Sequence, residues 1–341
     1  MAAGVRSHST ITDVAEHAGV SMKTVSRVFN DEPNVRPQTR DRVMAAAAAL
    51  DYHPNLAARS LAGRSSFLIG LSYENPSPNY VVDLQKGALD RLHGSRYRLL
   101  MLPVESAASV SGKMLSLTRA SGLAGLILTP PMSDDPATLD EFEQAGLPLV
   151  RIAATADLDR GVCIGMDDTA AAREAVEHLI GLGHRRIGIV CGEPRHPSSA
   201  DRLRGYREAL AAHGIADDPA LIEDGLYTFQ SGVDASQRLL ALADRPTAIF
   251  ASNDDMAAGV ISAGNEAGLK MPDQLSVVGF DDSAVATVVW PRLTTVHQPT
   301  YDMANAATAA MVSIVDGGDE HGRRLLPHHL VSRNSTAPPA A

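Results

Sequence analysis

Three side chains near the N-terminus have types and spacing suited to contacts with nucleic acid bases: Met22, Lys23 and Arg27. A guanidinium can donate two hydrogen bonds to O6 and N7 of guanine, an ammonium can donate to the same edge, and a thioether offers apolar contact. Val25 and Val28 recur beside them at helical spacing, so the three side chains face away from an apolar side. The pattern predicts a helix surface that reads DNA. The alternative, that Lys23 and Arg27 are solvated charges, leaves the surrounding motif unexplained.

The elements that would hold this surface are two short helices joined by a tight turn. Thr10 and Asp13 have the spacing of a capping box, which starts a helix near Ile11. Gly19 suits the left-handed residue that ends this helix, and Ser21 can cap the next one. The arrangement is that of a helix-turn-helix, whose second helix enters the major groove.

A third helix and a short segment follow. Residues 40–50 are rich in alanine and favour a helix, and Pro37 suits its first position. Residues 55–63 have helical composition, but they are too few to form an isolated helix in water. We therefore expect this segment to order only against a partner subunit or DNA.

The formal net charge of −10 is unevenly distributed along the 341 residues. Residues 1–64 contain 8 Lys and Arg against 6 Asp and Glu, and the remainder contains 22 against 34. A weakly basic head on an acidic body fits a DNA-binding protein that needs a dimer for tight binding.

Other functional classes find no support in the sequence. No run of 18 apolar residues predicts a membrane span, and the N-terminus lacks the apolar stretch of a signal peptide. Cys163 and Cys191 lie in apolar segments and are expected to be buried thiols in a reducing compartment. No metal-ligand spacing, nucleotide-binding loop or nucleophile motif is present, so we expect no cofactor and no enzymatic activity. Together these features predict a cytoplasmic protein.

From residue 66 onward, apolar runs alternate with helical stretches. The apolar runs cover residues 67–72, 97–102, 123–128, 147–152, 186–191, 247–251 and 275–280. Helices are expected near residues 79–93, 109–121, 136–145, 168–182, 200–213, 231–243 and 253–267. This alternation predicts a doubly wound parallel α/β architecture. Because this is too many repeats for one ordinary sheet, we expect two subdomains with a ligand cleft at the C-terminal ends of their strands.

Motifs along residues 9–335 support a more specific interpretation. In chain order they are Asp13-Val-Ala-x-x-Ala-Gly-Val-Ser-x-x-Thr-Val-Ser-Arg-Val-x-Asn30, Tyr52-x-Pro-Asn-x-x-Ala-Arg-Ser-Leu61, Gly183-His-Arg-Arg-Ile-Gly188, Arg202-x-x-Gly-Tyr206, Ala251-Ser-Asn-Asp-Asp255, Val278-Gly-Phe-Asp-Asp282 and Leu293-Thr-Thr295. The chain thereby resembles the lactose-repressor/galactose-repressor (LacI/GalR) family of transcriptional regulators. The first two motifs together are highly specific. The later ones are shared with periplasmic sugar-binding proteins.

The resemblance implies a homodimer whose heads bind the halves of a near-palindromic operator, while hinge helices pair in the minor groove. Leu61 matches a leucine that wedges between central base pairs and kinks the DNA, unless it packs on the body instead. Arg64 reaches a phosphate or is a linker charge, and Arg36 replaces the family's small polar cap before Pro37. The positions expected to contact DNA are Thr10, Ser21, Met22, Lys23, Thr24, Ser26, Arg27, Asn30, Asn55, Ala58, Leu61 and Arg64.

The resemblance also implies a small-molecule effector between the subdomains, which we expect to be a sugar or sugar derivative. The guanidinium of Arg202, the amide of Asn253 and the carboxylate of Asp281 match polar effector-binding positions of the family. Such groups, when they converge on a cleft, suit the paired hydroxyls of a sugar. Each of these effector contacts has a structural alternative. Arg202 and Asp281 could form structural ion pairs, Tyr227 could be a core residue, and Asp167 could start the following helix. Ala153 and Ala154 stand where many members carry a polar pair, and Trp290 is expected in the core. The expected effector-binding residues are Tyr80, Asp167, Arg202, Tyr227, Asn253 and Asp281.

The predicted fold is an all-α helix-turn-helix DNA-binding head joined to an α/β core that resembles periplasmic binding proteins and has two doubly wound subdomains. The expected divisions are a head at 9–54, a hinge helix and linker at 55–65, an effector-binding and dimerisation core at 66–335 and a disordered tail at 336–341. Within the core, the N-subdomain is placed at about 66–165 and 296–324, and the C-subdomain at about 166–293 and 325–335. The predicted function is a DNA-binding transcriptional repressor under allosteric control. The alternative is a sugar-binding sensor or transport module.

Overall fold

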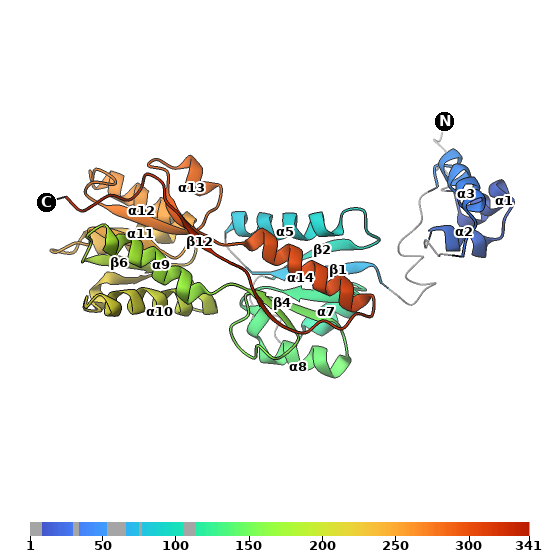
Figure 1. The fold of residues 1–341 in the computed structure, drawn as a ribbon, viewed down its shortest axis with the longest axis horizontal. Coiled ribbons are helices and arrows are strands. Elements are labelled where there is room, and N and C mark those ends of the chain that lie inside the picture. The colour runs from blue at the N-terminus through green and yellow to red at the C-terminus, as the bar shows by residue number, and fades with distance from the viewer. Residues whose placement is uncertain (1–8, 30–33, 53–65, 75–76, 105–112, 341) are drawn as a thin grey trace, which may run out of the picture. The chain divides into compact units, whose positions relative to one another are not determined.

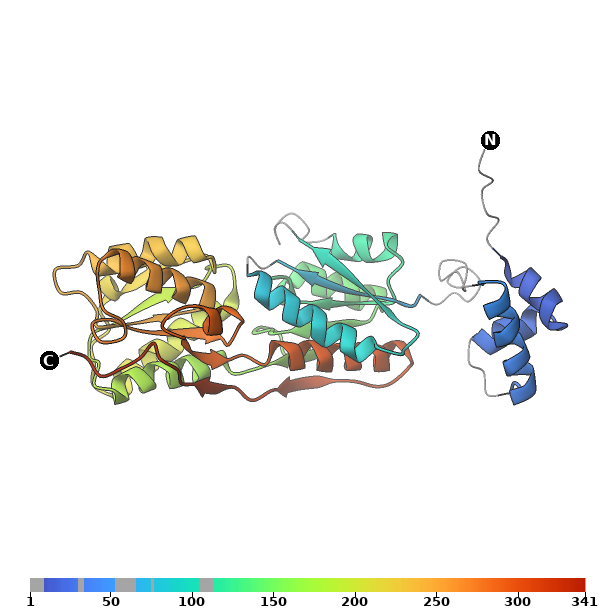
Figure 2. The same ribbon diagram turned by 90° about the horizontal axis from the view of Figure 1, so that it is seen from above.

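Residues 9–29, 34–52, 66–74, 77–104 and 113–340 are described by the computed structural model (Figures 1 and 2). The chain divides into two compact units between Phe67 and Leu68. Each unit is described separately below.

The first unit contains three helices, and local signals set their ends. The helices are α1 (Ile11–Ala18), α2 (Met22–Phe29) and α3 (Pro37–Ala49). The predicted capping box is confirmed, because the Thr10 hydroxyl accepts from the Asp13 N–H and the Asp13 carboxylate accepts from the Thr10 N–H. Gly19 has a φ of 61°, the predicted left-handed conformation. Ser21 Oγ accepts from the Thr24 N–H at 3.2 Å and caps α2, also as predicted.

The three helices enclose a small apolar core in which Val14, Val25 and Val43 are fully buried. The guanidinium of Arg40 donates to the Val28 carbonyl at 3.2 Å and ties α3 to the end of α2. Arg36 forms no side-chain cap on α3, as its replacement of a small polar residue predicted. This packing fixes which side of α2 is left for solvent.

The second unit is built on two six-stranded sheets. The first has the order β11-β5-β4-β3-β1-β2, and its neighbouring strands are parallel. The second has the order β12-β10-β9-β8-β6-β7 and is parallel except for the β10–β12 pair. The strands are β1 (Leu68–Tyr73), β2 (Arg98–Pro103), β3 (Gly125–Leu128), β4 (Leu149–Ile152), β5 (Val162–Gly165), β6 (Ile187–Cys191), β7 (Ile222–Asp224), β8 (Ala248–Ala251), β9 (Ser276–Asp281), β10 (Thr294–His297), β11 (Gly322–Leu325) and β12 (His329–Val331). The predicted pair of doubly wound α/β subdomains is therefore confirmed.

Helices cover both faces of each sheet (Figure 1). Helices α5 and α14 pack together against the first sheet, and α7 and α8 cover its other face. On the second sheet α9 packs with α10, and α11 packs with α12 on the opposite face. The helices are α5 (Pro78–Leu92), α7 (Met114–Ala120), η1 (Met132–Asp134), α8 (Pro136–Ala145), α9 (Asp168–Gly181), α10 (Pro197–Ala212), η2 (Pro219–Leu221), α11 (Phe229–Leu240), α12 (Asp254–Glu266), α13 (Val285–Val288) and α14 (Thr300–Val315).

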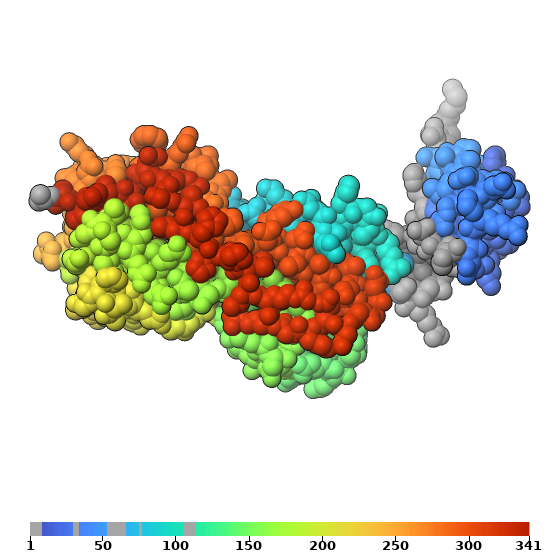
Figure 3. Space-filling view, in the orientation of Figure 1, coloured from blue at the N-terminus to red at the C-terminus, as the bar shows by residue number. Residues whose placement is uncertain are grey.

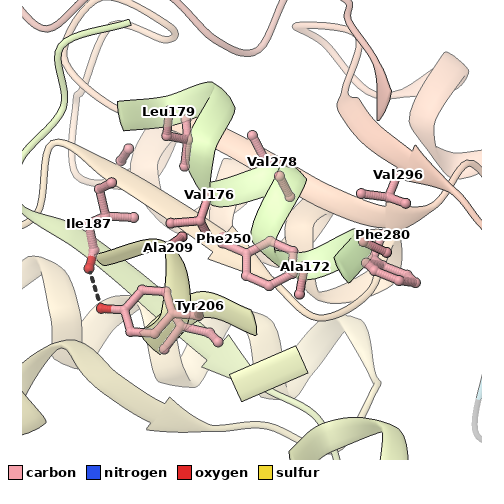
Figure 4. Packing of buried hydrophobic residues seen from close by; sticks show 14 of the residues in the cluster. Ala172, Val176, Leu179, Ile187, Tyr206, Ala209, Phe250, Val278, Phe280 and Val296 are labelled. Atoms are coloured by element: carbon pink, nitrogen blue, oxygen red, sulfur yellow. Dashed lines mark hydrogen bonds between the residues drawn. The ribbon is translucent and has the colours of Figure 1, made fainter. Parts of the chain in front are cut away.

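The second sheet is held to α9 and α10 by a tightly packed apolar layer (Figure 4). Val176, Leu179 and Phe250 are fully buried in it, as is Tyr206, whose hydroxyl donates to the Ile187 carbonyl at 2.8 Å. Burial of this kind leaves the starts of both helices in fixed positions at the C-terminal ends of the strands.

Five strands and one long helix were not predicted from the sequence. The missed elements are β5, β7, β10, β11, β12 and α14. The strands have only three or four residues each, too few for a periodic pattern. Because β10 pairs with β9 and β12, the second sheet extends to His297, and the predicted return to the N-subdomain near residue 296 comes one strand too early.

Two predictions about burial near the C-terminus are wrong. Trp290 is 76% exposed rather than part of the core. The tail predicted to be disordered at 336–341 lies in place on the second sheet, where the Ala337 N–H donates to Ser276 Oγ at 3.0 Å. The residue just before this tail, Ser335, is fully buried. Its hydroxyl accepts from the Thr294 N–H at 2.8 Å and donates to the Val277 carbonyl at 2.6 Å. A segment held by the hydrogen bonds of single hydroxyls needs no hydrophobic pattern. The sequence therefore did not indicate that this segment is ordered.

The predicted burial of Cys163 and Cys191 as free thiols is confirmed. Among the residues that the structure describes, no helix is both long and apolar enough to span a bilayer. The same residues contain no group of His, Cys, Asp and Glu side chains arranged to hold a metal ion.

Ser335→Ala should lower the free energy of unfolding of the core by about 1–3 kcal/mol, because it leaves two buried backbone groups without a partner. Urea denaturation of both proteins measures the difference. Truncation after Pro338 keeps these bonds and is the matched control, for which little change is expected. Equal midpoints for Ser335→Ala and the wild type would show that the segment is not an anchored part of the core.

Candidate functional site

The N-terminal end of α2 presents the three side chains that the sequence analysis singled out. Met22 and Lys23 are exposed, and Arg27 is half-buried. Thr12 Oγ1 donates to Met22 Sδ at 3.3 Å, which links the thioether to α1. The surface therefore offers one ammonium, one guanidinium and one apolar group along a single helix, as direct readout of base edges requires.

Hydroxyl groups surround this surface at the helix starts. Thr10 and Ser21 are exposed and cap α1 and α2, and Ser21 Oγ lies 2.9 Å from Thr24 Oγ1. Ser26 is half-buried on α2. Hydroxyls and N–H groups at helix N-termini are suited to phosphate oxygens, so these four positions remain predictions for backbone contacts.

The other predicted DNA contacts lie outside the described residues. They are Asn30, Asn55, Ala58, Leu61 and Arg64. The hinge helix and linker predicted at residues 55–65 also lie outside them, so both stay predictions.

A polar cavity lies at the C-terminal ends of the strands, and both subdomains contribute to it. Its volume is about 30 Å³, enough for one or two water molecules and far below the 300–1,000 Å³ typical of ligand pockets. The cavity is therefore closed in this conformation. Its lining residues are Ser77, Tyr80, Pro130, Ala153, Asp168, His196, Ser198, Arg202, Tyr227, Asn253, Asp281 and Gln298.

Arg202 is the central cation of this cavity and is 4% exposed. Its Nε donates to Asp168 Oδ1 at 2.9 Å, and its Nη2 donates to Gln298 Oε1 at 3.2 Å. Its Nη1 donates to a backbone carbonyl at the end of β8, and its Cζ lies 3.6 Å from the centroid of the Phe280 ring. The ion pair thus joins Arg202 to Asp168 and not to Asp281.

Tyr227 and Asn253 are fixed against each other. Asn253 caps α12 by accepting from the Met256 N–H at 2.9 Å, and its amide donates to the Tyr227 carbonyl at 3.0 Å. The Tyr227 hydroxyl lies 3.1 Å from Ser198 Oγ and 2.8 Å from Ser199 Oγ. The ring therefore forms a rigid wall of the cavity.

Backbone strain gathers around the cavity. Ala153, Tyr227 and Asp281 line it and have φ values of 50°, 59° and 114°, in the region that side-chain-bearing residues rarely adopt. Such strain costs on the order of 1–3 kcal/mol per residue and is found preferentially at ligand sites. Burial raises the pKa of Asp281 well above its usual range, although the positive charge of Arg202 partly opposes this.

The structure brings together five of the six predicted effector-binding residues and leaves one outside. Tyr80, Arg202, Tyr227, Asn253 and Asp281 line the same cavity. Asp167 instead caps α9, accepting from the Ala170 N–H at 2.9 Å, and faces an adjoining space of about 420 Å³. The alternative reading of Asp167 as a helix start thus describes its position.

Several lining residues were not found from the sequence: Ser77, Asp168, His196, Ser198 and Gln298. Asp168 follows Asp167 directly, and only the direction in which each side chain leaves the helix start distinguishes them. His196 precedes Pro197, a helix-start signal that would have placed it at the C-terminal end of a strand.

Two contacts join the subdomains across the cavity. Ser77 Oγ, at the start of α5, donates to Asp255 Oδ2 on α12 at 2.7 Å. Arg195 Nη1 lies 3.0 Å from Glu74 Oε1 at the end of β1. A movement that separates the subdomains at these two points breaks both contacts.

Comparisons with known proteins agree with this arrangement. Residues 10–55 match the model described as bacterial regulatory proteins, lacI family, and residues 176–336 match a periplasmic binding protein-like domain. The chain is 33% identical to catabolite control protein A of Priestia megaterium, over 96% of this chain and 99% of that protein. It is similar to the Lac repressor dimer bound to operator and the anti-inducer ONPF, with a TM-score of 0.84 and 30% identity over 97% and 100% of the two chains. The complex of the transcriptional regulator CelR with cellobiose has a TM-score of 0.73 and 29% identity over 96% and 99%.

Asp281→Asn should stabilise the core at pH 8 and much less at pH 4. The folded pKa lies above the unfolded value of about 3.9, so the ionised form is disfavoured in the folded state and stability is lost as pH rises through that window. The gain amounts to about 1.4 kcal/mol per unit of pKa difference. Urea denaturation at both pH values measures it. The exposed Asp224→Asn is the control, and a gain independent of pH would contradict the assignment.

Proposed function

We propose that this chain, which belongs to the lacI family of bacterial regulatory proteins, is a repressor that binds a near-palindromic operator as a dimer and responds to a small molecule in its cavity. Like its relatives, the chain is a transcriptional regulator and not an enzyme. One observation carries the fuller proposal: a single chain joins a base-reading helix surface to a strained polar cavity between two subdomains. Since chromosomal DNA is the proposed target, the protein acts in the cytoplasm.

In the proposed complex α2 enters the major groove. Arg27 contacts guanine with two hydrogen bonds, Lys23 donates to a neighbouring base edge, and Met22 packs on apolar base atoms. Thr10, Ser21, Thr24 and Ser26 position the head on phosphates. Leu61 remains the proposed minor-groove wedge.

An exposed apolar face on the core suits the dimer. Val288 at the end of α13 is 78% exposed and Trp290 is 76% exposed, and Val82 and Leu89 are exposed on α5. Helices α5 and α13 lie along the same upper edge of the core, in the teal and orange regions of Figure 3 (Figures 1 and 3). Large apolar side chains exposed together on one face mark a protein interface. This face therefore spans both subdomains.

The proposed control is a population shift between subdomain poses. The effector enters only when the contacts of Ser77 with Asp255 and of Glu74 with Arg195 are broken, so binding selects a different pose. An effector changes DNA affinity only through its differential affinity for the two poses. The relative that is described in complex with cellobiose supports a sugar as the ligand.

Selection of DNA fragments by the purified chain should enrich a short palindrome, and Arg27→Ala should weaken binding to it by roughly 10- to 100-fold and relax one position in each half. Arg42→Ala, on the exposed side of α3, removes the same charge and should cause only a small, sequence-independent loss. The selection is run with and without a bacterial metabolite extract. If neither condition enriches a palindrome, the proposed function is wrong.

Val288→Asp should convert the dimer to a monomer, because it places a charge on the most exposed apolar side chain of the proposed interface. Sedimentation velocity measures the mass, and operator affinity should fall together with dimerisation. Leu117→Asp is the matched control, since Leu117 is 43% exposed on α7 over the opposite face of the first sheet. If the two variants behave alike, this face is not the interface.

A further inference from the structure

The surface of α2 that is proposed to read bases carries a group that oxidants can change, the thioether of Met22. Met22 is 53% exposed at the first position of the helix and is not part of the apolar core of the head. Its Sδ accepts from Thr12 Oγ1 at 3.3 Å, so a hydroxyl of α1 holds the sulfur at the junction of the two helices. A chemical change at this atom would therefore alter the surface and leave the core of the head intact.

Most other methionines of the described chain are shielded from solvent. Met22 and Met44 are the only largely exposed ones there, at 53% and 51%. Met101 and Met271 are half-buried. The buried ones are Met114, Met132, Met166, Met256, Met303 and Met311. A dissolved oxidant therefore reaches the thioethers of the head before those of the core.

The two thiols do not compete as targets for a peroxide. Cys163 and Cys191 are 2% and 5% exposed. Burial raises the pKa of both thiols, to about 12 for Cys191. Since a thiol reacts as its thiolate, a buried thiol with a raised pKa is inert near pH 7. A thioether has no proton to lose, so the reactivity of Met22 depends on exposure and not on ionisation.

We propose that Met22 is an oxidation site that switches operator binding: a peroxide converts its thioether to the sulfoxide, which weakens the contact of α2 with bases. This rests on the proposed function of the head. In the step an S–O bond forms and the O–O bond of hydrogen peroxide breaks, so sulfur is oxidised by two electrons and the peroxide is reduced. The proton of the transferred oxygen passes to the departing hydroxide, which leaves as water.

The loss of affinity follows from the polarity of the new oxygen. Oxidation turns a flexible apolar side chain into a polar one, and Met22 is proposed to pack on apolar base atoms. A sulfoxide in that place gives up water from its oxygen, at an energetic cost unless a donor replaces the water. The major-groove edges of guanine and thymine present only acceptors and a methyl group, so they supply no donor.

The contact with Thr12 would keep the oxygen on the surface that reads bases. The Thr12 hydroxyl already donates to the sulfur, and it can donate to the sulfoxide oxygen, which is a better acceptor. Thr12 and Met22 are both exposed, so this bond forms without rearrangement of the buried core. Because each half of the proposed operator meets one Met22, oxidation of both heads of a dimer adds the two losses.

The first test locates the reaction in the full chain. The protein is treated with limiting hydrogen peroxide, and mass spectrometry of its peptides measures the sulfoxide at each methionine. Met22 and Met44 should oxidise well before the buried Met256, and the selected operator should protect Met22 while Met44 on α3 stays reactive. Oxidation of Met22 no faster than Met256, or equal oxidation of Met22 with and without operator, would overturn the inference.

The second test measures operator affinity before and after peroxide. The wild type should lose roughly tenfold or more, and methionine sulfoxide reductases, one for each epimer, should restore its affinity. Met22→Leu keeps an apolar side chain without sulfur, so its affinity should not respond to peroxide. Met44→Leu is the matched control, since it removes the other exposed thioether and should respond as the wild type does. Unchanged affinity of the oxidised wild type, or an equal loss in Met22→Leu, contradicts the proposal.

A third variant needs no oxidant. Met22→Gln places a permanent polar group on the same surface, so its affinity should fall about as far as that of the oxidised wild type. Its melting temperature should equal that of the wild type, because the core of the head is untouched; wild-type affinity for Met22→Gln would count against the inference. If the untreated wild type selects no palindrome, the proposed function itself fails, whereas an operator complex insensitive to peroxide removes only the switch.

Discussion

The geometry of the cavity depends on one buried cation, the guanidinium of Arg202. A charge removed from water is tolerated only when its hydrogen-bonding groups are satisfied, and here the start of α9, the end of β8 and Gln298 beyond β10 all supply acceptors. The Phe280 ring on β9 closes the remaining face. One side chain therefore holds together the strand ends of the second sheet and the segment that returns to the first.

This arrangement explains why the cavity is both strained and incompletely satisfied. Arg202 takes Asp168 as its partner, which leaves Asp281 without one, and Asp281 also has a left-handed backbone. A fold selected for stability alone would remove an unpaired carboxylate. Local violations of this kind are expected at functional sites, where ligand binding supplies the missing partners.

Features set by neighbouring residues could be predicted from the sequence, and features set by long-range packing could not. The capping box at Thr10 and the turn at Gly19 are local, so the head was predicted correctly. The short strand β5 and the anchoring of Ser335 depend on pairing with distant segments, and neither has a local signal. At the site, the motifs indicated Arg202 and Asp281, but choosing between Asp167 and Asp168 required the direction of each side chain. His196 was missed because a single histidine before a helix does not indicate whether its ring faces a cavity.

The charge distribution constrains how the cavity can control the head. The head carries little net positive charge, so a single head gains little from phosphates, and tight binding in the proposed dimer comes from linking two heads. The affinity gained by linking two heads depends steeply on the distance between them. The contacts that each head makes with DNA stay the same. A subdomain movement triggered in the cavity can therefore change operator affinity by altering that spacing, without altering Lys23 or Arg27. In the proposed dimer the weak basicity of the head would make operator binding sensitive to the pose of the core, because a strongly basic head would remain on DNA whatever that pose.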